Sequence, residues 1–195
     1  MKINWQLGIG FSGAESSGKT TLVQALGDSL NVPVVLGVVR DVVKEMNLTR
    51  PPAFGTDTAL TLEFQKNLFQ AKSLKEKFVQ APFLADRTMV DVFAYTLSVL
   101  GREASMQEFL KDYFAMCMDY NQNMYHFHFI VPTGKFDLVD DGLRNTLPYN
   151  AYMMHYMITG LIYDMSLPHH IIQSTKLEQR LDEVTWVMYN NGFLV

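Results

Sequence analysis

The sequence predicts a three-layer α/β protein in which a five-stranded parallel sheet lies between helices. Short apolar runs alternate along the chain with longer stretches whose apolar residues recur at helical spacing, which is typical of strands joined by helices. No internal repeat, low-complexity run or long linker interrupts this alternation. The length of 195 residues suits one domain over 1–195, with a small mobile lid over 134–145, where Gly, Asp and Arg occur together.

Each expected strand is a short apolar run, and each expected helix is a longer stretch with one apolar face. Pro132 stops the fourth strand because proline lacks a backbone N–H, and Pro148 lies in the first turn of a helix, where proline is tolerated. The expected strands cover 6–11, 32–39, 82–85, 125–131 and 169–173. The expected helices cover 20–30, 41–46, 56–78, 90–100, 106–120, 148–165 and 176–190.

Charge and cysteine content narrow the classes of function. The formal net charge of −4 argues against a general basic surface for nucleic acid, although a local basic cleft stays open. The single cysteine, Cys117, excludes an internal disulfide framework and fits a reducing compartment. The N-terminus lacks the apolar core of a signal peptide, and the apolar stretch 152–163 is too short to span a bilayer. We therefore expect a cytoplasmic protein that does not enter a membrane.

Residues 13–20 read Gly-Ala-Glu-Ser-Ser-Gly-Lys-Thr and match the P-loop pattern G-x-x-x-x-G-K-[ST] in full. Glycines let the backbone curl so that successive N–H groups converge on phosphate oxygens, and the following helix adds its positive end. Lys19 is expected to reach the β- and γ-phosphates of ATP, and the Thr20 hydroxyl to bind Mg²⁺. The predicted ATP-binding residues are Gly13, Glu15, Ser16, Ser17, Gly18, Lys19, Thr20 and Thr21.

A P-loop alone does not distinguish kinases from GTPases and motor ATPases. Guanine-specific proteins carry Asn-Lys-x-Asp after a late strand, and the corresponding stretch 171–176, Ile-Ile-Gln-Ser-Thr-Lys, lacks it. Large ATPases carry an apolar strand that ends in an acidic pair, and the sequence shows no such strand. The third expected strand is followed instead by Asp86, Arg87 and Thr88.

Four blocks in chain order are the P-loop 13–20, Arg40-Asp41, the block 86–95 that begins Asp-Arg-Thr, and 140–144, Asp-Asp-Gly-Leu-Arg. With these blocks the chain resembles the nucleoside and nucleotide kinase branch of P-loop proteins. It is similar to thymidylate kinases, deoxynucleoside kinases and the ribosylnicotinamide-kinase-like proteins of bacteria and bacteriophages. The resemblance implies a Mg²⁺-dependent enzyme that moves the terminal phosphate of ATP onto a nucleoside monophosphate.

Other acceptors and one other class of function stay open. One alternative acceptor is a nucleoside, including ribosylnicotinamide. Another is a modified base in DNA, and binding DNA would need a basic groove near Arg40, Arg50 and Lys66. A regulatory module would bind ATP and move the lid without transferring phosphate. Related nucleotide kinases are often dimers, so a homodimer is a further expectation from the resemblance.

The resemblance also implies roles for single residues near the phosphates. Asp86 is expected beside Mg²⁺ at the end of the central strand, or as the base that deprotonates the acceptor; its structural alternative is a helix cap. Arg87 is expected to hold the transferred or accepting phosphate, and its alternative is a surface ion pair. The lid residue Arg144 is expected to neutralise transition-state charge, and its alternative is a polar surface loop. The predicted catalytic residues are Lys19, Asp86, Arg87 and Arg144, and the predicted metal ligands are Thr20 and Asp86.

The acceptor is expected between the second strand and the long helix 56–78. Thymidylate kinases place an arginine after that strand for the acceptor's phosphate, and deoxynucleoside kinases place an acidic residue there that takes a proton from the 5′-hydroxyl. This sequence has both types in Arg40 and Asp41, so the resemblance does not decide between them; a capped, solvated helix start is the alternative. Phe64 and Phe69 are candidates to stack on a base and Gln65 to bind its edge, the alternative being core packing.

Overall fold

Five parallel strands form one sheet within the residues that the computed structural model describes, which are 2–53, 55–79, 81–134 and 147–195. Their order across the sheet is β2-β3-β1-β4-β5, which confirms the predicted fold class. Of the expected lid 134–145, every residue except Gly134 lies outside the described residues. The strands are β1 (Gly8–Ser12), β2 (Val34–Val35), β3 (Phe83–Asp86), β4 (Tyr125–Ile130) and β5 (His169–Ile171).

The described helices occupy the stretches where the sequence predicts them, with shifts at their ends. The largest extension is at α5, which continues past the expected end at 120 to Met124. They are α1 (Lys19–Leu30), α2 (Val39–Glu45), α3 (Thr58–Lys77), α4 (Met89–Leu100), α5 (Gln107–Met124), α6 (Pro148–Asp164) and α7 (Leu177–Asn190), with the short 3₁₀ helix η1 (Ala104–Met106) before α5. None of the helices in the described part of the chain is long and apolar enough to cross a membrane.

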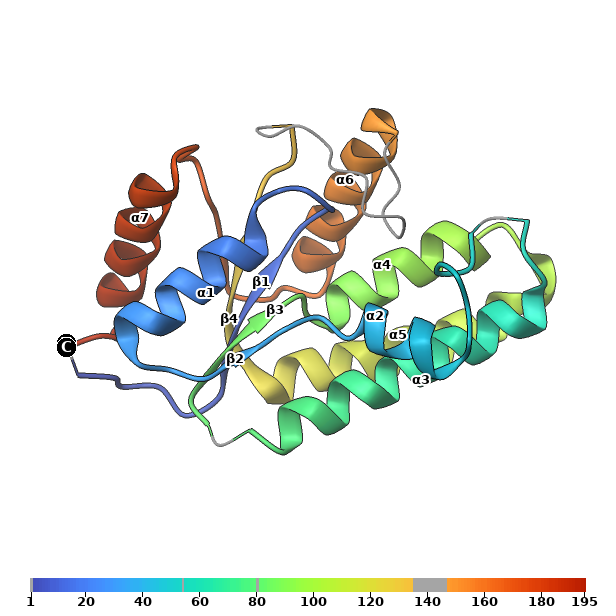
Figure 1. The fold of residues 1–195 in the computed structure, drawn as a ribbon, viewed down its shortest axis with the longest axis horizontal. Coiled ribbons are helices and arrows are strands. Elements are labelled where there is room, and N and C mark those ends of the chain that lie inside the picture. The colour runs from blue at the N-terminus through green and yellow to red at the C-terminus, as the bar shows by residue number, and fades with distance from the viewer. Residues whose placement is uncertain (1, 54, 80, 135–146) are drawn as a thin grey trace.

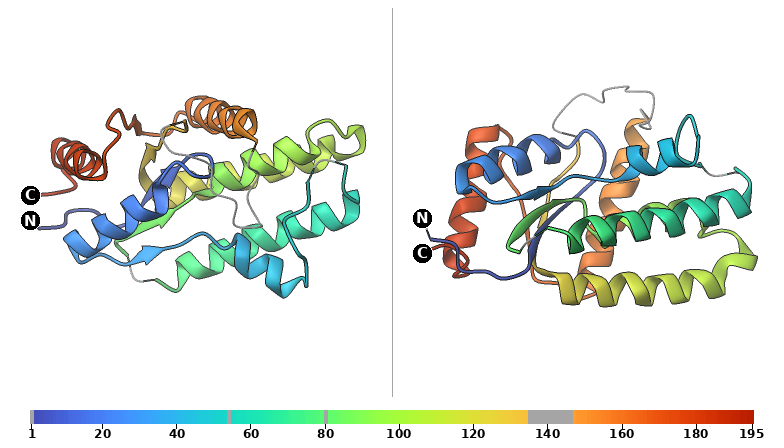
Figure 2. Two further views of the ribbon diagram at one scale, coloured as in Figure 1. Left: turned by 45° about the horizontal axis from the view of Figure 1, so that its top comes forward. Right: turned by 60° about the horizontal axis from the view of Figure 1, so that its bottom comes forward.

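The central strand β1 is buried along its whole length because helices cover both faces of the sheet (Figures 1 and 2). Helices α1 and α7 pack on one face, where Ile9 and Phe11 join their apolar side chains in one core cluster. Helices α3, α4, α5 and α6 lie on the other face. Side chains alternate along a strand, so Gly10 faces this second layer, and a Cβ there would collide with the Thr88 side chain. The close approach of α4 to β1 therefore depends on a glycine.

The prediction for the second strand was wrong in length. A strand was expected over 32–39, but β2 comprises only Val34–Val35, and α2 begins at Val39 rather than at 41. β2 is an edge strand that pairs only with β3 among the described strands, so little holds the chain in a ladder beyond it. Val38, Val42 and Val43 instead bury themselves in a cluster with α3, α4 and α5. Their spacing suits a helix, and packing outweighs the strand propensity of valine.

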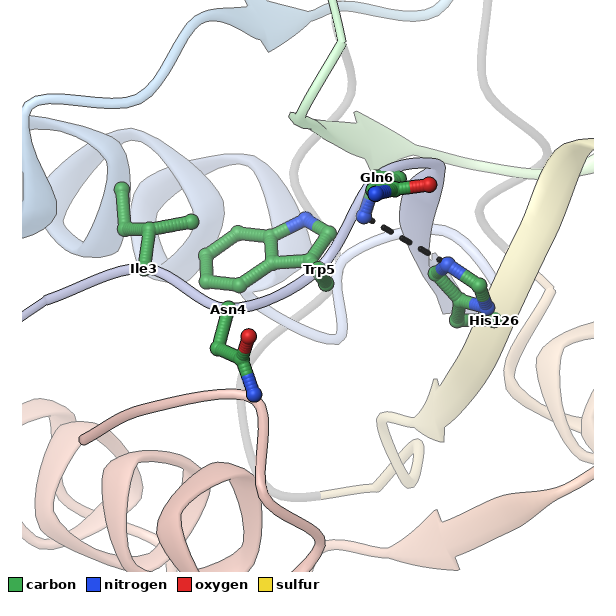
Figure 3. Close-up of a pocket in the computed structure, with 5 residues that line it drawn as sticks. All are labelled: Ile3, Asn4, Trp5, Gln6 and His126. Carbon is green, nitrogen blue, oxygen red and sulfur yellow. Dashed lines mark hydrogen bonds between the residues drawn. The ribbon is translucent and has the colours of Figure 1, made fainter.

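The two ends of the described chain lie side by side at the edge of the sheet where the strands begin (Figure 2). The Lys2 N–H donates to the Val195 carbonyl at 2.8 Å, and the Val195 N–H donates back at 3.0 Å. A shallow hollow of about 380 Å³ lies beside this pair, lined by Ile3, Asn4, Trp5, Gln6 and His126 (Figure 3). Because the P-loop follows the opposite end of β1, this hollow is separate from the site described next.

Candidate active site

The P-loop connects the buried end of β1 to the first turn of α1, and several of its residues have a positive φ, which few residue types adopt easily. Gly13, Ser16 and Gly18 have φ values of 152°, 55° and 81°. Positive φ is easy for glycine and costly for other residues, so Ser16 is held in a strained conformation by its neighbours. A Cβ on Gly13 would also overlap the Val131 carbonyl oxygen, which explains why the loop starts with glycine.

Lys19 opens α1 and folds back across the loop. Its Nζ donates to the Ala14 carbonyl at 2.5 Å and to Ser17 Oγ at 3.0 Å, and the side chain is 5% exposed. Both acceptors are uncharged, and no carboxylate among the described residues bonds directly to the buried ammonium. Burial, and next the positive charge of Arg87, lower the pKa of Lys19 from 10.5 to about 8. A polyanion at this position would relieve both effects.

Thr20 and Asp86 meet at the ends of two neighbouring strands. Phe11 of β1 is in register with Asp86 of β3, which brings the carboxylate beside the loop. The Thr20 hydroxyl donates to Asp86 Oδ2 at 2.6 Å, and Asp86 is 6% exposed. Hydroxyl and carboxylate oxygens are ligands that Mg²⁺ accepts, usually one or two from the protein with water and phosphate completing the shell. The pair therefore fits the predicted metal site in its chemistry.

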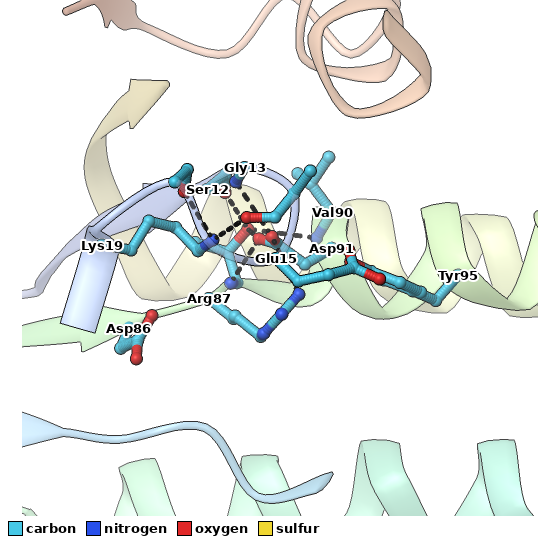
Figure 4. A network of polar contacts seen from close by, with 12 residues as sticks. Ser12, Gly13, Glu15, Lys19, Asp86, Arg87, Val90, Asp91 and Tyr95 are labelled. Carbon is cyan, nitrogen blue, oxygen red and sulfur yellow. Dashed lines mark hydrogen bonds and ion pairs between the residues drawn. The ribbon is translucent and has the colours of Figure 1, made fainter. Parts of the chain in front are cut away.

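Arg87 follows β3 in the left-handed backbone region, with φ of 70°, and its N–H donates to the Phe11 carbonyl at 2.9 Å. This backbone turns the side chain toward the P-loop (Figure 4). Its guanidinium lies 5.0 Å from the centre of the Tyr95 ring and 3.7 Å from Asp91 Oδ1. Burial opposes the charged form, but the electrostatic influence of Tyr95 and Asp91 outweighs it and raises the pKa of Arg87. A permanent, partly exposed cation thus stands beside Lys19.

Asp91 joins three parts of the site and was missed as a functional residue in the sequence. One carboxylate oxygen accepts from the Gly13 N–H at 3.1 Å, and the other accepts from the Thr88 N–H at 2.9 Å (Figure 4). The second bond completes a capping box at the start of α4, because the Thr88 side chain caps the same turn. The Thr88-x-x-Asp91 spacing was a signal for the cap, but nothing local predicted the bond to the P-loop.

Glu15, within the P-loop, faces away from solvent toward α4. Its carboxylate accepts a hydrogen bond from the Tyr95 hydroxyl, and Glu15 is 7% exposed. Since the Tyr95 ring also lies under Arg87, one tyrosine contacts both the loop and the arginine. Burial, with a smaller contribution from Glu15 and despite the opposing charge of Arg87, raises the pKa of Tyr95. Tyr95 therefore stays a neutral donor.

Arg180 of α7 also reaches the P-loop. Its Nη1 donates to the Ser17 carbonyl at 2.7 Å and its Nε to the Ser174 carbonyl at 3.0 Å. The residue is 1% exposed and lies 163 positions from Ser17 in the chain. No local sequence pattern points to this contact.

The residues predicted for the acceptor are less closely grouped. Arg40 and Asp41 are exposed on α2, and Asp41 pairs with Lys75 of α3 at 3.5 Å. The turn that leads to α2 approaches Arg87, since a Cβ on Gly37 would lie 3.6 Å from Arg87 Cδ. The roles of Arg40 and Asp41 stay predictions.

The three candidates on α3 are mostly buried. Phe64 is 2% exposed in the core cluster with α2, α4 and α5, and Gln65 Oε1 accepts from the Thr96 hydroxyl at 2.9 Å. Phe69 contacts the rings of Tyr113 and Tyr120 edge to face. Their roles in base binding stay predictions. Ser16 lies within the P-loop and Thr21 directly after it, exposed on α1, whereas Arg144 lies outside the described residues.

These features define a P-loop protein with an α/β fold. The chain belongs to the AAA_28 family, described as an AAA domain, whose sequence model matches residues 9–180. No curated protein sequence matches it significantly. The described part of the chain holds no cluster of three or more His, Cys, Asp or Glu suited to a metal.

Several solved structures share the fold, a thymidylate kinase and a deoxyadenosine kinase among them. NadR in complex with NAD and AMP-PNP superposes with a TM-score of 0.65 at 15% identity, over 97% of this chain and 51% of NadR, so the chain spans about half of that protein. A Candida albicans thymidylate kinase superposes with a TM-score of 0.63 at 14% identity, over 96% of this chain and 92% of the kinase. A deoxyadenosine kinase from M. mycoides with bound dCTP superposes with a TM-score of 0.65 at 10% identity, over 94% of this chain and 100% of the kinase. The chain therefore has the fold of P-loop nucleoside and nucleotide kinases.

Proposed function

We propose that the protein is an ATP-dependent phosphotransferase whose acceptor is a nucleoside monophosphate. The observation that carries the proposal is the grouping at the ends of β1 and β3, where Lys19, the Thr20–Asp86 pair and Arg87 face one loop. Parallel α/β sheets bind ligands at this edge. A P-loop with two cations and one carboxylate matches what phosphoryl transfer requires, which is positioning and charge neutralisation.

The donor would bind with its β- and γ-phosphates in the loop. Its negative charge would replace the uncharged acceptors that Lys19 now contacts and would offset the repulsion between Lys19 and Arg87. Mg²⁺, where bound, would neutralise phosphate charge with Thr20 and Asp86 as its protein ligands. Arg87 would hold an oxygen of the moving phosphoryl group, which its planar fork suits.

In the transfer itself, the bond from the γ-phosphorus to the bridging oxygen breaks and leaves ADP. A new bond forms between that phosphorus and an oxygen of the acceptor. With a monophosphate the attacking oxygen is already an anion and needs no base. With a nucleoside the hydroxyl proton must leave, and Asp86 or Asp41 would accept it. Asp41 is exposed and pairs with Lys75, whereas Asp86 bonds to Thr20 of the P-loop. Asp86 is therefore the better placed of the two aspartates to act as the base.

A nucleoside acceptor is the second candidate, because NadR in complex with NR and a deoxyadenosine kinase share the fold. The deciding experiment measures ADP release from Mg·ATP with a panel of nucleosides, ribosylnicotinamide, nucleoside monophosphates and a short DNA. We expect one monophosphate to stimulate release and Lys19→Ala to abolish the stimulation. Stimulation by a nucleoside or by DNA would show that this compound class, and not a nucleoside monophosphate, is the acceptor. ATP binding without stimulation by any acceptor would reject the kinase and favour the regulatory module.

A further inference from the structure

Arg180 is one of the largest fully buried side chains of the described chain, although arginine is rarely buried without a specific partner. Two of its guanidinium nitrogens, Nε and Nη1, donate to the protein backbone. They meet two backbone carbonyls, Ser17 in the P-loop and Ser174 in the loop after β5. Both loops leave the same edge of the sheet, so Arg180 joins two segments that would border a bound nucleotide.

The bond to Ser17 fixes the direction of a peptide unit. In a trans peptide the C=O of Ser17 and the N–H of Gly18 point in opposite directions. Arg180 holds this carbonyl from the α7 side of the loop, and the Gly18 N–H must therefore point away from α7. In P-loops, backbone N–H groups bind phosphate oxygens, so the direction of this N–H matters for the anion.

The second loop is fixed by the same helix. Glu183, one turn after Arg180, accepts from the N–H groups of Gln173 and Ser174, both at 2.8 Å, and from His170 Nε2 at 2.7 Å. Burial would raise the pKa of Glu183, but the hydrogen bonds from Ser174, Gln173 and His170 lower it to about 2, so the carboxylate stays charged. The Ser174 carbonyl is thus held in place as the second anchor of Arg180.

We infer that Arg180 is a positioning residue for the phosphates of ATP, because it holds the Ser17 carbonyl behind the P-loop and so turns the Gly18 N–H toward the anion. The inference rests on the proposed ATP binding. It extends the site to the last helix, α7, which packs on the same face of the sheet as α1. Arg180 does not touch the phosphates itself; it acts through the backbone of the loop.

The test compares Arg180→Met with the wild type and with Gln179→Met, an exposed neighbour on α7. Methionine keeps much of the apolar volume and removes the donors. Affinity is measured by competition against a fluorescent ATP analogue, with Mg·ATP and with inorganic tripolyphosphate as competitors. We expect Arg180→Met to weaken both competitors by about tenfold or more and by similar factors, and Gln179→Met to change neither.

Unchanged ATP affinity in Arg180→Met would overturn the inference, and so would a loss for ATP that tripolyphosphate does not share. Failure of the wild type to bind ATP would instead reject the proposed function, and with it the reason for positioning phosphates. Thermal melting of each variant shows whether it is folded. If the methionine variant does not fold, Arg180→Gln, which is shorter and uncharged, is measured in the same way with the same two outcomes.

Discussion

Two buried polar clusters of this protein use similar residues and differ in how their charges are matched. The strand-end network surrounds the P-loop and consists of Glu15, Lys19, Asp86, Arg87, Asp91 and Tyr95. The helical cluster lies at the other edge of the sheet and consists of Lys72, Glu76, Tyr120 and Tyr125. Each contains a buried lysine, at least one carboxylate and at least one tyrosine hydroxyl.

In the helical cluster the charges are matched within the fold. Lys72 Nζ lies 2.7 Å from Glu76 Oε1, with the two side chains 1% and 0% exposed. The hydroxyls of Tyr120 and Tyr125 donate to the same carboxylate at 3.0 and 2.7 Å. These residues lie in regular helix or strand without positive φ. We infer from this pairing that the helical cluster has a structural role.

In the strand-end network the matching is incomplete. Lys19 bonds to two uncharged oxygens and its pKa is lowered, whereas Ser16 and Arg87 occupy strained backbone. Strain and a destabilised charge persist where the surroundings enforce them, and they are concentrated at functional sites. The difference indicates that Lys19, whose ammonium bonds to uncharged oxygens, has a functional role, whereas Lys72, which is paired with Glu76, has a structural one.

The largest effect is expected for Glu76→Gln in the helical cluster. It leaves the buried charge of Lys72 unpaired, and breaking such a pair costs about 3–5 kcal/mol of unfolding free energy. Urea unfolding measures this loss, with the exposed Glu63→Gln on the same helix as a control. ATP affinity of the folded protein should not change. A variant as stable as the wild type would contradict the structural role of the pair.

Lys19→Met should have the opposite profile. Removing a charged bond to phosphate weakens Mg·ATP by about 100-fold, whereas the melting temperature stays the same or rises because a buried charge without a carboxylate partner is removed. Calorimetry gives the affinity and thermal melting the stability, with the exposed Lys77→Met as a control. A large loss of stability with retained ATP binding would show that Lys19 is structural.

Asp91→Asn should combine both profiles, because Asp91 caps α4 and also holds the P-loop. An amide has one acceptor oxygen, so either the Gly13 or the Thr88 N–H loses its partner, and Arg87 loses a counter-charge. We expect unfolding free energy to fall by about 1–3 kcal/mol and ATP affinity to fall by about tenfold. The exposed Asp112→Asn serves as a control. A change in only the unfolding free energy or only the ATP affinity would contradict the dual role of Asp91 in capping α4 and holding the P-loop.

The lowered pKa of Lys19 predicts opposite responses of affinity and stability to pH. Above about 8 the free protein loses the Lys19 proton, so ATP binding must take one up, and affinity falls by about tenfold per pH unit. Between about 8 and 10.5 the unfolded chain holds more protons than the folded one, so stability from this group rises with pH. Titrations across this window measure both. Lys19→Met should remove both slopes, and a slope that persists would assign the titration to another group.

The sequence predicts what depends on residues close together in the chain. The P-loop follows from eight consecutive residues, 13–20, and the position of Asp86 follows from the apolar run before it. The contacts that complete the site join distant segments: Asp91 to Gly13, Tyr95 to Glu15 and Arg180 to Ser17. No local pattern encodes them. The prediction of a longer second strand failed for a related reason. The conformation of Val38, Val42 and Val43 is decided by their burial against α3 to α5, which are distant in the sequence.

The most direct test of phosphoryl transfer follows the γ-phosphate itself by ³¹P NMR in mixtures of Mg·ATP, protein and acceptor. We expect the γ-phosphate signal of ATP to be lost and the signals of a new phosphoanhydride to appear on a nucleoside monophosphate, with no such product for Lys19→Ala. A new phosphomonoester would instead identify a nucleoside as the acceptor. If ATP stays intact with every acceptor, or yields only free phosphate, the strand-end network does not carry out the proposed transfer.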